Sequence, residues 1–425
     1  MLKGLLDAFR VPEVRKKLLF TAAILLLYRF GAYLPVPGVP FQDMLTLYEA
    51  SMSSSGYLAV LNLFSGGALS RMSVFSLGIM PYITAQIIMQ LMQAVIPSLG
   101  DLAQEGESGR RKLTQYTRYL TIALAVLNSV GYLFLFSYYG VDFSDMEIPE
   151  LLEDVIVVFS MTVGAVIIMW LGEIITQRGI GNGMSLIIFC NIMSGLPSAI
   201  LSSLDSTSDI ILTIITLVVI VAIIPIIVYV ERGQRRIPIQ YAKRVSGRRV
   251  MGGQNTYLPI KVNTAGVVPI IFASAILYLP AQIAIFFPSV EWIQTVADAC
   301  SSGWVNWILS VVLIVAFAYF YSSLVFDPVQ TADQLRKQGG YIPGVRPGDA
   351  TAQYIKSTIS HITLPGALFM ACLAVVPTII FWFTDNTLIQ SFGGTSVLIM
   401  VEVAMELVSS IDSQLKMYNY DGVFH

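Results

Sequence analysis

Histidine and cysteine, the side chains that most often carry catalysis or bind metal ions, are scarce in this sequence. Only two histidines occur in 425 residues, which excludes a catalytic or metal centre built on histidine. The spacing of the three cysteines matches neither a metal site nor a disulfide pair, so we expect no metal, no cofactor and no enzymatic activity. These cysteines are Cys190, Cys300 and Cys372.

A glycine-rich segment, RGIGNGMSLIIF, superficially resembles a phosphate-binding loop. Gly179, Gly181 and Gly183 lie within five residues, but no strand precedes them and no Lys-Ser or Lys-Thr pair follows. A tight turn with close helix packing is therefore favoured over nucleotide binding. No Walker-type motif occurs elsewhere in the sequence, so any energy must come from a partner or from a gradient.

Polar and ionisable side chains interrupt several long apolar runs. Isolated amides in a membrane often form hydrogen bonds between helices worth about 0.6 kcal/mol, but the same groups could line a separable seam. Ionisable groups inside a membrane are functional candidates by default. Of these, only Glu402 is predicted to lie deep, whereas Arg29 and Glu406 can reach an interface. The polar positions are Thr84, Gln86, Gln90, Asn128, Asn191 and Asn263.

Ten long apolar runs must position these groups. The sequence is 55% hydrophobic and 12% charged, with a mean hydropathy of +0.72, whereas soluble domains are usually about 25% charged. A bilayer core about 30 Å thick requires about 20 apolar residues per helix. Alternating β-barrel segments are absent, so the expected fold class is an all-α polytopic membrane protein with ten transmembrane helices. The predicted spans are roughly 18–35, 74–97, 119–139, 155–171, 184–202, 210–230, 265–287, 304–326, 362–383 and 389–411.

Basic residues alternate strictly between the segments that connect these runs. Of 25 Lys and Arg residues, 23 fall in the odd-numbered segments, which carry 5 (residues 1–17), 4 (98–118), 1 (172–183), 8 (231–264), 4 (327–361) and 1 (the tail). Because positive charge is retained in the cytosol during insertion, both the N- and the C-terminus are predicted to be cytoplasmic. Residues 1–17 are predicted to form a short amphipathic cytoplasmic helix rather than a cleaved signal peptide.

A broken apolar segment precedes the second predicted span. Residues 61–73 are apolar at first, but Gly66 and Gly67 interrupt them and Arg71 and Ser73 follow. A half-length segment at the entry of a span is typical of a re-entrant loop or of a plug folded into a cavity. An interfacial helix on the outer leaflet explains the same composition equally well.

Two cytoplasmic loops are longer than connections require. Residues 231–264 hold eight basic residues against one acidic residue, and the alternation around Ile237 and Ile239 predicts a projecting β-hairpin. In residues 327–361, Gly-Gly and Pro-Gly pairs force turns, with Arg346 at the tip. Orientation and attraction to anionic lipid need only a few charges next to a span. Docking of an acidic or RNA-containing partner is therefore favoured.

Six long segments of this sequence are specific enough to compare with known families: FSGGALSRMSVFSLGIMPYI, EGESGRRKLTQYTRYLT, WLGEIITQRGIGNGMSLIIF, ERGQRRIPIQYAKR, YLPIKVNTAGVVPIIFASAI and GGYIPGVRPGDAT. Together they resemble the SecY family, the central channel subunits of the bacterial Sec protein translocase. The resemblance extends over nearly the whole chain and implies two pseudo-symmetric, inverted five-helix halves, residues 1–203 and 204–425, hinged between the fifth and sixth helices. It also implies an hourglass pore with an apolar waist.

The resemblance also implies roles for particular residues. A narrow ring of apolar side chains resists wetting and excludes ions, and this pore ring would comprise Ile79, Ile83, Met184, Ile188, Ile271 and Ile399. The plug would comprise Phe64, Ser65, Gly66, Gly67, Ala68, Leu69, Ser70 and Arg71. The lateral gate would carry Thr84, Asn128 and Asn263. The partner-binding residues would be Arg235, Arg236, Lys243, Arg244, Arg248, Arg249 and Arg346.

For the whole chain, the resemblance implies translocation of unfolded secretory polypeptides across the bacterial inner membrane and release of membrane-protein segments through the lateral gate into lipid. The implied partners are the SecE and SecG subunits, the SecA motor ATPase, the ribosome, signal-sequence-bearing polypeptides and membrane lipids, but not DNA. A secondary transporter of a small solute is the alternative, since inverted repeats and broken helices also occur there. The aliphatic midplane and the large basic loops favour the channel.

Several positions depart from the family pattern. Met184 stands where isoleucine is usual in the ring, Glu402 where glycine or an apolar residue is usual, and His361 where arginine is common. The tail also lacks the usual basic extension. We expect Glu402 to face the helix-packing side or to be protonated.

Overall fold

The computed structural model is a bundle of long helices with a small sheet at one end. It describes residues 9–39, 62, 65–138, 149–205, 210–241, 244–246, 249–251, 256–264, 266–286, 290–301, 303–384 and 394–421. The first half contributes α2 (Pro12–Gly31), α5 (Met80–Val95), α6 (Pro97–Gln104), α7 (Glu107–Tyr138), α8 (Glu150–Arg178) and α9 (Gly183–Asp205). The second half contributes α10 (Ile210–Glu231), α11 (Val268–Phe286), α12 (Glu291–Ser301), α13 (Gly303–Val325), α14 (Pro328–Lys337), α15 (Asp349–Thr384) and α17 (Gly394–Asp421).

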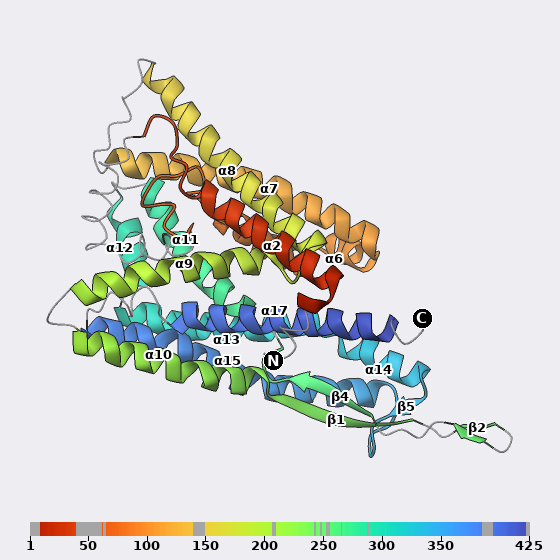
Figure 1. Ribbon diagram of the computed structural model, residues 1–425. Coiled ribbons are helices and arrows are strands. Elements are labelled where there is room, and N and C mark those ends of the chain that lie inside the picture. The colour runs from red at the N-terminus through yellow and green to blue at the C-terminus, as the bar shows by residue number, and fades with distance from the viewer. Residues whose placement is uncertain are drawn as a thin grey trace.

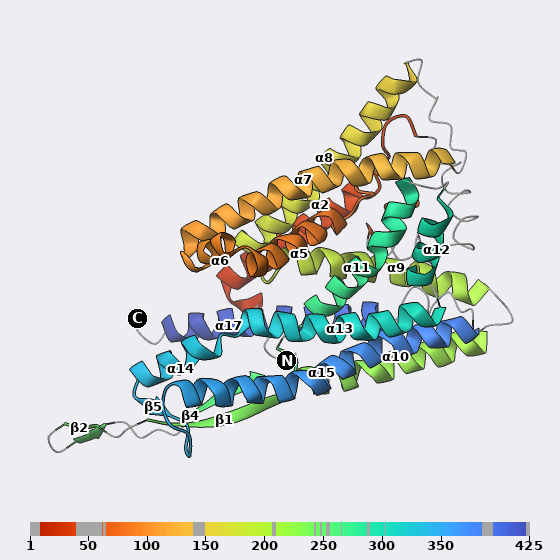
Figure 2. The ribbon, with the colours of Figure 1, turned by 180° about the vertical axis from the view of Figure 1, so that it is seen from behind.

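The helices form two groups that meet along a central layer (Figure 1). One group contains α2, α7 and α8, and the other contains α10, α13, α15 and α17. Between them lie α9 and α11, and the view from behind shows α5 in the same layer (Figure 2). Helix α9 packs against α8 and α17, whereas α11 packs against α7 and α13, so each connects the two groups.

The basic segments gather at one end of the bundle. The first turns of α7, the helices α6 and α14 and the sheet all lie at this end, and α12 lies at the other (Figures 1 and 2). This arrangement agrees with the sided charge of the sequence. The amphipathic helix α12 was not expected, because residues 290–301 contain no long apolar run and were predicted to be a connecting segment.

Among the described residues, five helices are long and apolar enough to cross a membrane. A sixth candidate is the pair α5 and α6, which bends by 107° where Pro97 ends α5. Helices α9 and α11 contain shorter apolar stretches, Gly183–Pro197 and Val268–Leu277. The chain is therefore a polytopic helical membrane protein, and the count of ten spans and the orientation stay predictions.

Two helices begin at residues other than those predicted from the sequence. Helix α2 starts at Pro12, which favours the first turn of a helix, so residues 12–17 of the predicted amphipathic helix belong to α2. Residues 1–8 of that predicted helix lie outside the described residues. The second span was predicted to begin at residue 74, but α5 begins at Met80. Residues 74–79 form turns instead, because Met72 and Gly78 adopt left-handed conformations, with φ of 43° and 56°.

The two long basic loops form one structure, here called the basic module. Strand β1 (Gln234–Tyr241) pairs antiparallel with β4 (Thr256–Lys261), which confirms the predicted hairpin. On its other edge β1 pairs with β5 (Gly340–Tyr341) from the second loop, giving the order β4-β1-β5. A further pair, β2 (Arg244–Ser246) and β3 (Arg249–Met251), extends the hairpin.

The basic module has its own apolar core, separate from the core of the bundle. The inward face of the sheet packs on α14 and on the first turns of α15. Asp327 caps α14 by accepting hydrogen bonds from the backbone amides of Val329 (2.8 Å) and Gln330 (3.2 Å). The buried core residues are Ile237, Ile239, Ile260, Leu335, Ile342, Ile355 and Ile359.

Replacing Ile355 with alanine should loosen the basic module without disturbing the membrane helices. Ile355 is fully buried in the module core, and truncating a buried isoleucine costs about 2–5 kcal/mol. We expect faster hydrogen exchange of the β1 and β4 amides in the Ile355→Ala variant. The matched control is Tyr354→Ala, because Tyr354 is 41% exposed. Equal exchange in the two variants would contradict a shared core.

Candidate functional site

The six residues of the predicted pore ring come from four elements in both halves of the chain. Ile79 precedes α5 and Ile83 lies one turn into it, while Met184 and Ile188 are one turn apart on α9. The others are Ile271 on α11 and Ile399 on α17.

All six residues belong to one apolar cluster, here called the central cluster. Five of them are between 1% and 8% exposed, and the half-buried Ile271 packs against the rest. The sulfur of Met184 lies against Gly172 of α8, at a position that a Cβ on residue 172 would occupy. Aliphatic side chains offer water and ions no hydrogen bonds, so entry into a cluster of this composition is unfavourable for both.

The segment predicted to be the plug is buried against the central cluster. Ala68 is fully buried in this cluster, and Leu69 and Met72 are fully buried in a second cluster formed with α7 and α8. An interfacial helix would expose these side chains, so the burial favours a segment folded into the protein. Phe64 lies outside the described residues.

The segment 65–73 satisfies its backbone largely by itself. The amide of Ser70 donates to the Asn62 side-chain oxygen (3.1 Å), and the amide of Leu69 donates to the Ser65 hydroxyl (3.1 Å). Further on, the amide of Val36 donates to the carbonyl of Met72 (3.0 Å) and so ties the segment to the chain that follows α2. The turn therefore keeps a defined shape although it is not helical.

Two arginines hold this segment to the end of α2. Arg29 donates from Nη1 to the carbonyl of Gly66 (2.8 Å). The guanidinium of Arg71 lies 4.3 Å from the centre of the Tyr33 ring, and that of Arg29 lies 5.5 Å from the same centre. Arg29 was identified from the sequence as an ionisable residue within the first span. Its partner could not be predicted, because a backbone carbonyl is present at every residue.

The three predicted gate residues do not form one hydrogen-bonded group. The hydroxyl of Thr84 donates to the carbonyl of Met80 within α5 (3.0 Å). Asn263 lies between β4 and α11 and not inside a span, and its amide donates to Glu231 at the end of α10 (2.6 Å). Asn128 is half-buried on α7, and in the described part of the chain no hydrogen bond joins these three side chains. The helices that carry the predicted gate are nevertheless in contact, since α11 packs against α5 and α7.

Two acidic residues inside the bundle have distinct surroundings. Glu173 of α8 forms a bidentate ion pair with Arg118 of α7, with distances of 2.8 and 2.6 Å, which the sequence analysis missed. Glu402 of α17 faces Gly266, where a Cβ would lie 2.6 Å from its Oε1. The second oxygen of Glu402 is buried and has no hydrogen-bond partner among the described residues. Glu402 thus packs against the segment that leads into α11.

The glycine-rich segment is a tight turn, as predicted. Gly181 adopts a left-handed conformation with φ of 76°, and a Cβ on Gly183 would overlap the carbonyl of Gly172. The amide of Gly183 donates to the hydroxyl of Thr176 (2.9 Å). Close packing of α8 on α9 therefore explains these glycines.

Basic side chains cover the surface of the basic module. Arg235 and Arg236 are exposed on β1, and the guanidinium of Arg236 lies 4.8 Å from the centre of the Tyr257 ring. Arg346 is exposed in the turn between β5 and α15. The other predicted partner-binding residues lie on β2 and β3 (Arg244 and Arg249) or outside the described residues (Lys243 and Arg248).

The fold and the site define a polytopic helical membrane protein in which residues of both halves enclose an apolar centre beneath a basic module. The chain belongs to the SecY family, whose family model matches residues 73–408. It is 44% identical over 438 residues to the protein translocase subunit SecY of Streptomyces lividans, and the match covers 99% of each chain. The corresponding protein of Mycobacterium tuberculosis strain H37Rv is 43% identical over 442 residues, with 99% of each chain covered.

Solved structures share the fold at lower sequence identity. One is a protein-conducting channel, with a TM-score of 0.63, 20% identity and coverage of 93% of this chain and 91% of that one. Another is Sec61 in the canine ribosome-channel complex from the endoplasmic reticulum, with a TM-score of 0.60, 18% identity and 95% of each chain covered.

A methyl group on Gly66 should dislodge the segment 65–73. The Cβ would lie 2.6 Å from Asn191 Oδ1 and 2.7 Å from Arg29 Nη1. The matched control is Gly67→Ala, because Gly67 has a similar positive φ but no atom within 4 Å of its Cβ position. We expect faster hydrogen exchange of residues 68–73 in Gly66→Ala than in Gly67→Ala. The same exchange in both variants would show that contact with Asn191 and Arg29 does not hold the segment.

Proposed function

We propose that this protein is a protein-conducting channel that moves unfolded secretory polypeptides across the bacterial inner membrane. The observation that carries the proposal is the central cluster, which joins aliphatic residues of both halves and has the segment 65–73 buried against it. A narrow aliphatic ring blocks ions by resisting wetting, yet its flexible side chains part around a polypeptide because no directional bonds must break. In this proposal the six central residues are the pore ring and residues 64–71 are the plug.

The plug closes the channel at rest. Its buried apolar side chains and the hydrogen bond from Arg29 hold it in place, and an arriving substrate displaces it. One of the similar solved structures, 20% identical and with a TM-score of 0.62, is described by the statement that the plug domain of SecY stabilises the closed state and maintains a membrane seal. That description supports the same role here.

The lateral gate lies where α5 and α7 meet α11. Thr84, Asn128 and Asn263 contribute polar groups there, and hydrogen bonds between membrane helices are weak enough for the seam to part. Hydrophobic signal sequences and membrane-protein segments then leave sideways into lipid. The ten spans, the two inverted halves and the cytoplasmic termini complete this topology.

The basic module is the docking surface on the cytoplasmic side. Its exposed arginines, with Arg346 in the turn before α15, suit the SecA motor ATPase and the ribosome, which supply the energy that the chain has no motif to supply. The similarity to Sec61 of a ribosome-channel complex supports a ribosomal partner. The SecE and SecG subunits complete the channel.

A secondary transporter of a small solute is the competing function. Such a protein carries polar or charged groups at the interface of its repeats, near the bilayer midplane. The central cluster of this chain is aliphatic instead, and the transporter would leave the basic module without a purpose.

Reconstitution of the full chain with SecE and SecA in lipid vesicles tests the channel directly. We expect ATP-dependent entry of an unfolded secretory precursor. The Arg346→Glu variant should abolish this entry, because reversing the charge repels an acidic docking surface. The control is Lys416→Glu, which makes the same change on the exposed end of α17. Uptake of a small solute without precursor entry would refute the channel, and normal entry with Arg346→Glu would refute the docking role alone.

A polar side chain in the ring should open an ion leak. Ile188→Asn places an amide in the central cluster, and we expect the resting potassium leak of reconstituted vesicles to rise by about tenfold, since wetting a hydrophobic constriction removes its barrier. Met193 lies on the same helix but is 41% exposed, so Met193→Asn is the matched control. An unchanged leak in Ile188→Asn would place the waist elsewhere.

A further inference from the structure

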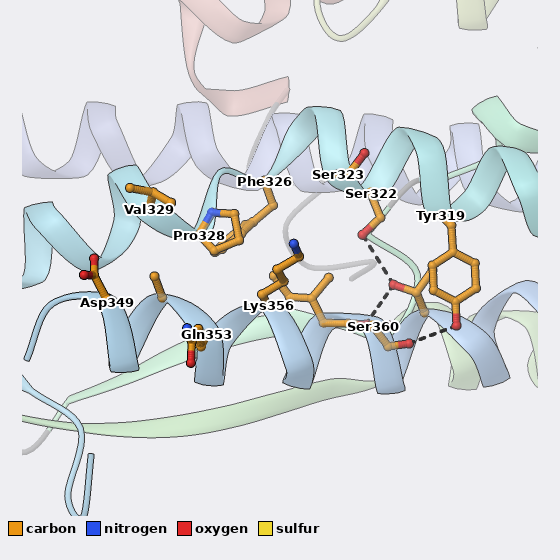
Figure 3. A pocket seen from close by; sticks show the side chains of 13 residues that line it. Tyr319, Ser322, Ser323, Phe326, Pro328, Val329, Asp349, Gln353, Lys356 and Ser360 are labelled. Carbon is orange, nitrogen blue, oxygen red and sulfur yellow. Dashed lines mark hydrogen bonds between the residues drawn. The ribbon is translucent and has the colours of Figure 1, made fainter. Parts of the chain in front are cut away.

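A cleft opens between α13 and α15 at the end of the bundle that carries the basic module, and the start of α14 closes one side of it (Figure 3). Its volume is about 570 Å³. None of the residues that line the cleft belongs to the central cluster, the plug, the gate or the docking arginines. The proposed channel therefore leaves it without a role.

The walls of the cleft are joined by hydrogen bonds between the two helices. The hydroxyl of Tyr319 on α13 donates to the carbonyl of Ser360 on α15 (3.2 Å). One turn further along α13, the hydroxyls of Ser322 and Thr363 are 3.3 Å apart. Figure 3 shows both contacts at the same end of the cleft. The cleft is thus a preformed site.

Two charged side chains line the cleft, and they have opposite signs. Asp349 is the first residue of α15, and Lys356 lies two turns further along the same helix, a rise of about 10 Å. Figure 3 shows Lys356 directed between the helices toward α13. Within the described residues neither side chain forms an ion pair. The site therefore offers one cation and one anion to a ligand.

Apolar side chains extend from the cleft along both helices. Phe326, Pro328 and Val329 form its apolar wall. Beyond it, Leu364 and Leu368 follow Ser360 at intervals of four residues on α15 and are 45% and 50% exposed. Both helices are candidate membrane spans, so these leucines face lipid. A ligand in the cleft would have its polar part at the membrane surface and its apolar part in the hydrocarbon.

We propose that this cleft binds one phosphatidylethanolamine molecule by its headgroup. The phosphate accepts hydrogen bonds from the ammonium of Lys356, and the ethanolamine ammonium donates to the carboxylate of Asp349. The acyl chains lie along Leu364 and Leu368. A headgroup with a single negative charge would pair with Lys356 but would leave Asp349 without a cationic partner. A zwitterionic headgroup supplies both charges, which favours phosphatidylethanolamine.

Native mass spectrometry of the full chain in its detergent-purified complex tests this site without requiring transport. Phosphatidylethanolamine and phosphatidylglycerol are added separately at equal concentration, and the retained lipid is counted. We expect the wild type to prefer phosphatidylethanolamine, and Lys356→Gln to retain about tenfold less of it through the loss of one charge-assisted contact. Asp349→Asn should instead shift the preference toward phosphatidylglycerol, because only the partner of the ammonium is lost.

Lys337→Gln is the matched control, since Lys337 is an exposed lysine of α14 that does not line the cleft. Equal retention of the two lipids by the wild type would overturn the proposal. Retention of phosphatidylethanolamine by Lys356→Gln at the wild-type level would also overturn it. If Lys356→Gln instead bound a partner subunit more weakly and retained the same amount of lipid, the cleft would be assigned to a protein partner. Failure here would leave the channel proposal intact, because precursor entry depends on other residues.

Discussion

The structure depends on one constraint of the bilayer, which is that non-helical backbone must find its hydrogen-bond partners inside the protein. Residues 65–79 are a turn-rich stretch buried within a bundle of membrane helices, so every peptide group there needs a local partner. Serine and asparagine side chains supply several of these partners, and Arg29 supplies another to Gly66. The left-handed conformations of Gly66 and Gly67 make the turn tight enough to fit.

The same constraint separates the aliphatic centre from the polar contacts around it. Directional bonds lie beside the central cluster, between Arg29 and Gly66, between Arg118 and Glu173, and between Asn263 and Glu231. Among the described aliphatic residues of the cluster the attraction is apolar packing, which is non-directional. Directional polar contacts thus fix the geometry of the surrounding segments, while non-directional packing fills the centre.

The sequence predicted features that local patterns encode and missed those made by distant contacts. The β1–β4 hairpin follows from alternation around Ile237, and the turn at Gly181 follows from glycine spacing. The contact between Arg29 and Gly66 joins residues that are 37 apart in the sequence, and β5 pairs with β1 across about a hundred residues. No local sequence pattern predicts either contact. The predicted start of the second span at residue 74 was wrong, because apolar composition does not distinguish a buried turn from a helix.

Helix α15 is one of the elements that connect the basic module to the centre of the bundle. It is continuous from Asp349 to Thr384 and carries both Ile355 of the module core and Ala367 of the central cluster. Pro365 lies between them and removes a backbone hydrogen bond, which makes this the point where the helix bends most easily. Along α15, a displacement of the module reaches the central cluster only through Pro365, so the angle at this proline sets how much of it arrives.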